Sequence, residues 1–272
     1  MRCALWLLLL VAAPAAAQER VEVMSGGLHL KGILYRPDGR GPFPAILFNH
    51  GSGPSQRAYE AEAAALGPVF ARHGYAFLYL CRRGVGLSVG QGENSFDAIQ
   101  RAAAAHGSDG RNATQLELLQ SAEVDDANAG LAYLRARPDV DGGRLAVVGH
   151  SFGGATALLQ GERDAALRAI VTFGAAAFSW PRSPPLQKRL LGAVSAASAP
   201  IFFIHAANDF SVAPGKAMAA RRHELKMPAK LEIYPAVGRT ADEGHAFVYS
   251  SVAVWEADVF RFLDAAENQR AE

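Results

Sequence analysis

The chain has 272 residues, half of them hydrophobic, which is enough to bury a large core within a single domain. Lysine plus arginine number 27 and aspartate plus glutamate number 26, a net charge of +1 at neutral pH. This balance supplies no field that would attract nucleic acid or an anionic membrane surface, so neither is expected as a partner.

The first residues have the order of charge and hydrophobicity typical of a secretion signal. Arg2 supplies a positive charge, residues 4–13 are all apolar, and three alanines at 15–17 precede the polar Gln18. This pattern predicts a signal peptide over residues 1–17, and a mature domain over 18–272 in the periplasm or outside the cell. A membrane anchor is the alternative, but the apolar run is shorter than the roughly 20 residues that cross a bilayer.

Strand-like and helix-like segments alternate along the mature chain. Short apolar or alternating runs predict strands at 21–23, 28–35, 45–49, 76–81, 144–148, 169–173, 201–205 and 231–234. Helical spacing predicts helices at 58–73, 122–136 and 252–263, with others that begin near 155 and 212. The alternation predicts an α/β fold, with a mostly parallel sheet of about eight strands and helices on both faces.

A candidate nucleophile lies between a predicted strand and a predicted helix. Gly149-His150-Ser151-Phe152-Gly153 follows the strand at 144–148 and opens a helix of small residues. A G-x-S-x-G segment in this context forms a sharp turn that exposes the serine hydroxyl, and the helix N-terminus behind it favours negative charge at the reacting centre. The pattern therefore predicts Ser151 as a catalytic nucleophile.

A nucleophilic serine needs a base, and the base needs an acid that orients it. In enzymes with this turn the order along the chain is serine, acid, histidine, each in a loop after a strand. Asp209 follows the strand at 201–205, and His245 follows the strand at 231–234. We therefore expect Asp209 and His245 to complete a triad, with Asp242 and Glu243 as the fallback for the acid.

Acyl transfer also requires two donors that stabilise the oxyanion. The sequence predicts the backbone N–H of Phe152 as one donor, since it directly follows the nucleophile. The second is expected in the glycine-rich loop after the strand at 45–49, from Ser52 or from its neighbour Gly51. His50, in the same loop, is expected to bond loop backbone and not to act as a base.

Five motifs together resemble a known family: HGSG at 50–53, RRGVGLS at 82–88, GHSFGG at 149–154, HAAND at 205–209 and GHAF at 244–247. They are similar to α/β hydrolases of the dienelactone-hydrolase and prolyl-oligopeptidase-like branches, over roughly residues 28–263. Ser151 stands where dienelactone hydrolases use cysteine, and Ala206 stands where a glycine is usual. The resemblance implies the α/β-hydrolase fold, and it allows Arg82 or Arg83 to contact a substrate carboxylate. A structural role in the turn is the alternative for both arginines.

Two insertions could cover the nucleophile. Residues 88–121 are polar and rich in glycine, which predicts an irregular, mobile flap apart from an alanine-rich piece. Residues 176–198 carry Phe178, Trp180 and several prolines, and predict a rigid turn that leads into a short amphipathic helix. The aromatic pair Phe178 and Trp180 is expected to form a wall of the acyl pocket, with Trp180 as the residue that binds substrate and packing at the sheet edge as the alternative.

These residues predict a serine hydrolase that cleaves carboxylic esters of small or medium molecules. An amide or peptide hydrolase with the same triad is one alternative, and a non-catalytic binding protein on the same fold is another. No cofactor or metal is expected, because no cluster of His, Cys and carboxylate residues has the spacing of metal ligands.

Overall fold

The computed structural model describes residues 17–268. The expected signal peptide, residues 1–17, therefore lies outside the described residues except for its last position. The described chain begins with an antiparallel pair, β1 (Ala17–Ser25) and β2 (Leu28–Arg36), which Gly26 and Gly27 join. The φ angles of these glycines are 52° and 85°, in the left-handed region that a two-residue hairpin turn requires.

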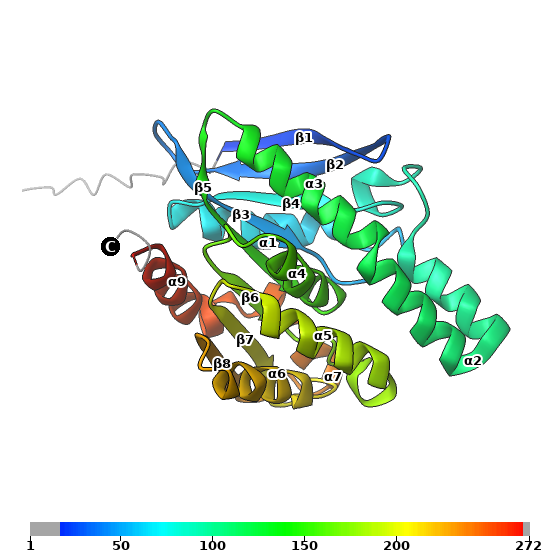
Figure 1. The fold of residues 1–272 in the computed structure, drawn as a ribbon. Helices are drawn as coiled ribbons and strands as arrows, with labels where there is room; N and C mark the ends of the chain where they lie inside the picture. Colours follow the sequence, from blue (N-terminus) through cyan, green and yellow to red (C-terminus); the bar gives the residue numbers. More distant parts are fainter. Residues whose placement is uncertain (1–16, 269–272) are drawn as a thin grey trace, which may run out of the picture.

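One sheet runs through the molecule (Figure 1). Its other strands are β3 (Phe43–Asn49), β4 (Ala76–Cys81), β5 (Val140–His150), β6 (Ile170–Phe173), β7 (Ile201–Ala206) and β8 (Ala229–Tyr234). The strand order is β1-β2-β4-β3-β5-β6-β7-β8. β2 pairs with β1 and β4 in antiparallel fashion, and every later pair is parallel. The predicted architecture, a mostly parallel sheet of eight strands, is confirmed.

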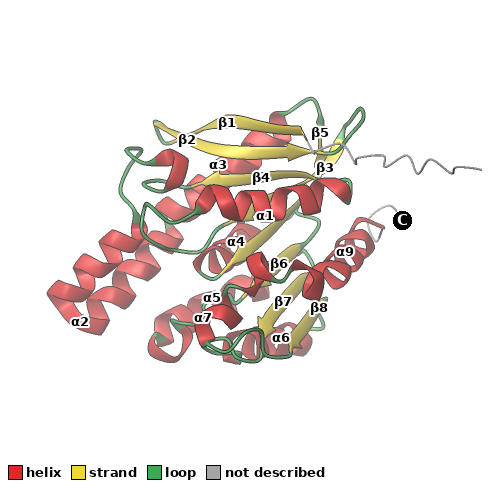
Figure 2. Ribbon diagram, turned by 180° about the vertical axis from the view of Figure 1, so that it is seen from behind, coloured by secondary structure: helices red, strands yellow, loops and turns green. Residues whose placement is uncertain are grey.

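Helices cover both faces of the sheet, and each face has its own apolar core (Figures 1 and 2). One core lies under α3 (Ala122–Ala136), α4 (Phe152–Arg163), α5 (Pro184–Ala196) and α6 (Ala213–Glu224). The other lies under α1 (Tyr59–Arg72), α8 (Phe247–Ser250) and α9 (Val252–Asn268). All six residues of β4 are buried between these cores, which explains its uninterrupted apolar sequence.

The first insertion is not the irregular flap that the sequence predicted. After a short 3-10 helix, η1 (Gly86–Ser88), residues Ser95–Gln120 form helix α2, which has non-helical backbone at His106 and Gly107. The Asn94 side chain caps its start by accepting from the Phe96 N–H at 2.8 Å. Gly107, with a φ of 62°, reverses the chain, so that two helical halves lie side by side and project from the body (Figures 1 and 2). Glycine here marks a reversal between helices, not a mobile loop.

The second insertion has the predicted form, a turn followed by a helix. Residues Trp180–Arg182 make a 3-10 helix, η2, and α5 follows directly. The Ser183 side chain accepts from the Leu186 N–H to cap α5, and prolines occupy its first positions, where no amide donor is needed. Across residues 17–268, no helix is long and apolar enough to cross a membrane.

Candidate active site

Ser151 lies at a strained turn between β5 and α4. Its φ of 55° and ψ of −117° are outside the regions that a non-glycine residue normally adopts, a strain of roughly 1–3 kcal/mol. Glycines make the turn possible, because a Cβ on Gly153 would lie 2.1 Å from the Asn49 carbonyl oxygen. A Cβ on Gly149 would lie 2.2 Å from the Gly153 carbonyl oxygen. The predicted nucleophile elbow is present in this geometry.

Asp209, in the turn after β7, accepts hydrogen bonds from two histidines. Its Oδ1 is 2.7 Å from His245 Nδ1, and its Oδ2 is 2.9 Å from His205 Nδ1. Burial alone would raise the pKa of Asp209, but the bonds from His205 and His245 outweigh it and lower the pKa to about 2. Asp209 is thus ionised at neutral pH and fixes the proton of His245 on Nδ1, which leaves Nε2 free to accept a proton.

Asn208 anchors the loop that carries His245. Its Nδ2 donates to the carbonyls of Val237 and Thr240, each at 2.8 Å, and its Oδ1 accepts from the Val237 N–H. His245 ends the short helix α7 (Ala241–His245), and Thr240 and Glu243 form a capping box at its start. Glu243 is therefore engaged in a helix cap, and Asp209 is the carboxylate that bonds His245.

The two predicted oxyanion donors border the same cavity as Ser151 and His245. Phe152 opens α4, and amides in the first turn of a helix have no partner within the helix. Ser52 lies in the loop after β3, where Arg57 Nη1 donates to its carbonyl at 3.0 Å. Arg57 is in turn held by Glu62, 2.6 Å from its Nε. The loop that carries the second donor is thus fixed by an ion pair.

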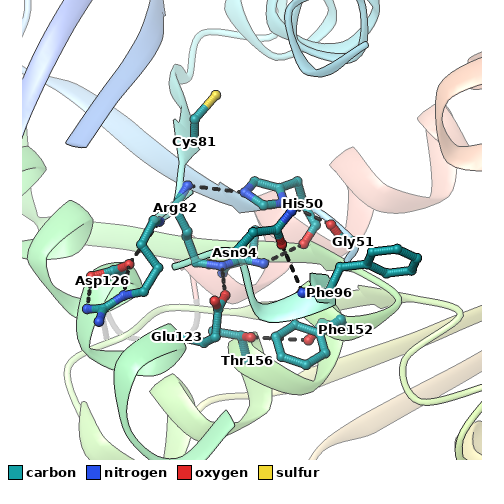
Figure 3. Close-up of polar contacts among 12 residues, drawn as sticks. His50, Gly51, Cys81, Arg82, Asn94, Phe96, Glu123, Asp126, Phe152 and Thr156 are labelled. Carbon is teal, nitrogen blue, oxygen red and sulfur yellow. Dashed lines mark hydrogen bonds and ion pairs between the residues drawn. The ribbon is translucent and has the colours of Figure 1, made fainter. Parts of the chain in front are cut away.

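His50 and Arg82 bond the backbone at the start of this loop, as Figure 3 shows. His50 Nδ1 donates to the Gly51 carbonyl at 2.8 Å, and its Nε2 accepts from the Arg82 N–H, so His50 bonds loop backbone as expected. Arg82 pairs with Glu123 of α3 and donates through Nη2 to the His50 carbonyl at 2.9 Å. The Arg82 side chain is only 2% exposed, so the prediction that Arg82 could contact a substrate carboxylate is wrong. Arg82 has the alternative, structural role in the turn.

A cavity of about 420 Å³ opens over Ser151. Its polar and charged lining residues are Ser52, Arg57, Gln100, Arg111, Gln115, His150, Ser151, Ser179, Asp242 and His245. Its apolar lining residues are Phe96, Ile99, Phe152, Ala155, Ala176, Phe178 and Phe210. A cavity of this size, lined by both polar and apolar side chains, suits a small organic molecule.

Of the predicted aromatic pair, Phe178 lines the cavity and Trp180 does not. Trp180 is 7% exposed and belongs to the core cluster under α5, because η2 turns its side chain into the protein. Phe178 is 42% exposed, lines the cavity and contacts Phe210 edge to face at 5.3 Å. Phe210 in turn lies 5.0 Å from the His245 ring. The sequence predicted the segment and its aromatic pair, but Trp180, which was expected to bind substrate, packs in the core.

Helix α2 supplies cavity residues that the sequence analysis missed. Phe96, Ile99 and Gln100 come from its first half, and Arg111 and Gln115 come from its second half. The Arg111 guanidinium lies over the Phe178 ring at 5.2 Å, and burial together with the charge of Arg182 lowers its pKa. The helical reversal at Gly107 brings the two halves to one cavity. Because residues 88–121 were expected to be irregular, the sequence did not indicate that two helical halves would line the cavity.

Comparison with known protein families shows which family the chain belongs to. The model of the dienelactone hydrolase family matches residues 31–267. The chain belongs to the dienelactone hydrolase family. The same family was expected from the motifs at 50–53, 149–154 and 244–247, and that expectation is confirmed. Within residues 17–268, no three His, Cys, Asp or Glu residues form a group suited to bind a metal ion.

The chain is also similar to individual proteins, at low sequence identity. It is 26% identical over 152 residues to the quorum-quenching protein AidA of Acinetobacter baumannii, a match that spans 56% of this chain but only 42% of that relative. The Pyrococcus furiosus esterase Pf2001 superposes with a TM-score of 0.66 at 15% identity, covering 92% of this chain and 91% of the esterase.

The Pyrococcus horikoshii acylaminoacyl peptidase superposes with a TM-score of 0.65, also at 15% identity, covering 93% of this chain and 42% of the peptidase. These likenesses establish the α/β-hydrolase fold. The family match adds that the chain is a member of the dienelactone hydrolase family.

Proposed function

We propose that the protein is a serine hydrolase that cleaves carboxylic esters of small or medium molecules through an acyl-enzyme on Ser151. One observation carries the proposal. His245, bonded at 2.7 Å to the ionised Asp209, lines the same cavity as Ser151, which the strained turn after β5 exposes. This is the arrangement of nucleophile, base and orienting acid that acyl transfer requires.

In the proposed reaction, Ser151 Oγ attacks the ester carbonyl while His245 Nε2 takes the hydroxyl proton. Asp209 stabilises the resulting imidazolium through the bond to Nδ1. The N–H groups of Phe152 and Ser52 stabilise the oxyanion of the tetrahedral intermediate. The intermediate collapses to an acyl-enzyme as His245 returns the proton to the leaving alcohol. Water, activated by the same histidine, then releases the acid and restores Ser151.

The walls of the cavity support a preference for short acyl chains. Phe178 and Phe210 close one side, and the two halves of α2 close another, which leaves about 420 Å³. Such a volume accommodates a small or medium ester and no long lipid channel. We therefore propose higher activity on soluble acetate and butyrate esters than on emulsions of long-chain triglycerides, with no activation at an oil–water interface.

Amide or peptide hydrolysis by the same residues is the nearest alternative. The acylaminoacyl peptidase shares the fold, and leaving-group preference depends on the walls of the pocket rather than on the triad. A non-catalytic binding protein is the alternative from another class. It would retain the cavity without a reactive serine.

Labelling with a fluorophosphonate probe tests the proposal directly. We expect covalent modification of Ser151 in the wild-type protein and none in Ser151→Ala, which should remain folded because a small side chain is changed. Rates on p-nitrophenyl esters are then compared with rates on aminoacyl anilides. Absence of labelling would support a binding protein, and faster anilide cleavage would support a peptidase. Either result would overturn the proposed esterase.

A further inference from the structure

His150 is a buried histidine that the proposed reaction does not use. It is the last residue of β5, directly before Ser151, and is 2% exposed. Its ring centre lies 4.7 Å from that of His245 and 5.1 Å from that of Tyr249, which belongs to α8. The side chain therefore lies in contact with the proposed base while its backbone is joined to the proposed nucleophile.

Both ring nitrogens of His150 have partners that define its protonation. Nε2 is 2.9 Å from the His245 carbonyl oxygen, which can only accept, so Nε2 carries the proton and donates. Nδ1 then accepts from the Tyr249 hydroxyl at 3.2 Å. Burial, followed by the nearby charges of His245 and Arg57, lowers the pKa of His150 well below its usual value. The ring stays neutral at pH 7, so it adds no second positive charge when His245 becomes protonated.

Through Tyr249, the contacts of His150 extend to the loop after β3 that carries Ser52. Tyr249 lies beside Glu62 and Arg57, and burial together with the Glu62 carboxylate raises its pKa, which keeps the phenol a proton donor. Glu62 binds Arg57, and Arg57 holds the Ser52 carbonyl. The His150 network, made of His150, Tyr249, Glu62 and Arg57, thus joins the loops of the nucleophile, the base and the second oxyanion donor.

We propose that His150 is a positioning residue that holds His245 against Ser151 through its hydrogen bond to the His245 carbonyl. The inference rests on the proposed function, since it assigns a role in the same reaction. His245 is then fixed at two points: Asp209 holds the ring, and His150 holds the backbone. The loop before it is exposed at Thr240, where Asn208 anchors it, and the bond from β5 adds a direct tie between residue 245 and the strand that carries the nucleophile.

Two amide variants separate this role from mere packing. In His150→Gln the side-chain amide nitrogen lies at about the position of Nε2, within reach of the His245 carbonyl, whereas in His150→Asn it lies near Nδ1 and falls short. Both replacements are polar, uncharged and smaller than histidine. They differ chiefly in whether the bond to residue 245 is made.

We expect His150→Asn to lower kcat for p-nitrophenyl butyrate by about 10- to 100-fold with little change in KM, since small displacements of a catalytic group cost this much. We expect His150→Gln to restore kcat to within about threefold of wild type, as a retained hydrogen bond would. The low-field proton resonance of the His245–Asp209 bond should be sharp in wild type and His150→Gln, and broadened in His150→Asn. Melting temperatures are measured alongside.

Each result of these measurements either supports or overturns the proposed role of His150. Equal kcat in both variants and wild type overturns the proposal, and so does equal loss in both, because packing alone would then explain it. If neither variant folds, Tyr249→Phe takes their place, since it removes the donor to Nδ1. A decrease in kcat without a change in KM then supports the proposal, and wild-type kinetics refutes it. Failure of wild type to react with fluorophosphonate would instead refute the proposed function, so the two failures are distinguishable.

Discussion

Replacing Asp209 by asparagine keeps the shape of the side chain but removes one of its two acceptor oxygens. His205 and His245 both donate to this carboxylate, through Nδ1 at 2.9 Å and 2.7 Å. An amide presents one oxygen and one NH₂ group, so one imidazole must turn an unprotonated Nδ1 toward the amide. When that ring is His245, its proton moves to Nε2, which can no longer accept from Ser151.

We expect kcat of Asp209→Asn to fall by about 10⁴-fold, as such a wrong tautomer produces in serine proteases. This corresponds to about 5.5 kcal/mol of lost transition-state stabilisation. The assay is steady-state hydrolysis of p-nitrophenyl butyrate between pH 6 and 9, with active sites counted by fluorophosphonate labelling. Asp242→Asn is the matched control, since Asp242 lines the cavity but does not orient His245, and its kcat should stay close to wild type. Near-normal kcat in Asp209→Asn, or a comparable loss in Asp242→Asn, would refute the assignment of the acid.

The same carboxylate predicts a pH dependence of stability. Its pKa of about 2 in the folded protein is below the ordinary 3.8, so its contribution to stability is present above pH 3.8 and is lost as the pH falls through 2. The shift corresponds to about 2 kcal/mol, an order-of-magnitude figure. Denaturant unfolding followed from pH 5 to pH 2 should show this loss in wild type. Asp209→Asn should show a smaller loss, and equal slopes in the two proteins would contradict the reasoning.

Three further predictions follow from the positions of single side chains. Phe178→Ala should change acyl-chain selectivity with little change in melting temperature, whereas Trp180→Ala should cost about 3–5 kcal/mol of stability, as loss of a buried aromatic does. A Phe178→Ala protein with wild-type selectivity would argue against the aromatic wall. Glu123→Gln should destabilise the protein by about 3–5 kcal/mol by leaving Arg82 unpaired, and wild-type stability would show that the buried pair is not needed. We also propose export to the periplasm or beyond, so mass spectrometry of the mature protein should find Gln18 at its N-terminus, and an intact Met1 would rule out cleavage.

The sequence predicted the sheet and the order of the site residues because these depend on local pattern. Buried parallel strands are short apolar runs, and the strand at 76–81 matches β4 at both ends. Likewise, the G-x-S-x-G segment leaves little choice of backbone, because glycines at 149 and 153 are needed where strand and helix nearly touch. Steric requirements of this kind are visible in a single sequence.

The cavity walls were not predictable in the same way. Whether Phe178 or Trp180 faces the cavity depends on the rotation of a 3-10 turn against α5, which the packing of many residues decides. Residues 88–121 have the composition of a loop, yet tertiary contacts with α3, α4 and α5 support a helix there. Local sequence pattern therefore predicted the positions of the candidate site residues better than it predicted the shape of the cavity around them.

The candidate site is formed by two parts of the chain, the loops that follow strands of the central sheet and helix α2. The proposed nucleophile, base and acid follow strands of the central sheet, while Phe96, Ile99 and Arg111 lie on an insertion between β4 and α3. Glycines at the nucleophile elbow tolerate almost no replacement, because any added side chain would strike backbone. None of the α2 residues that line the cavity is a glycine of this kind. New substrate preferences could thus arise in evolution, or in the laboratory, by exchange of α2 alone, with the chemistry inherited unchanged.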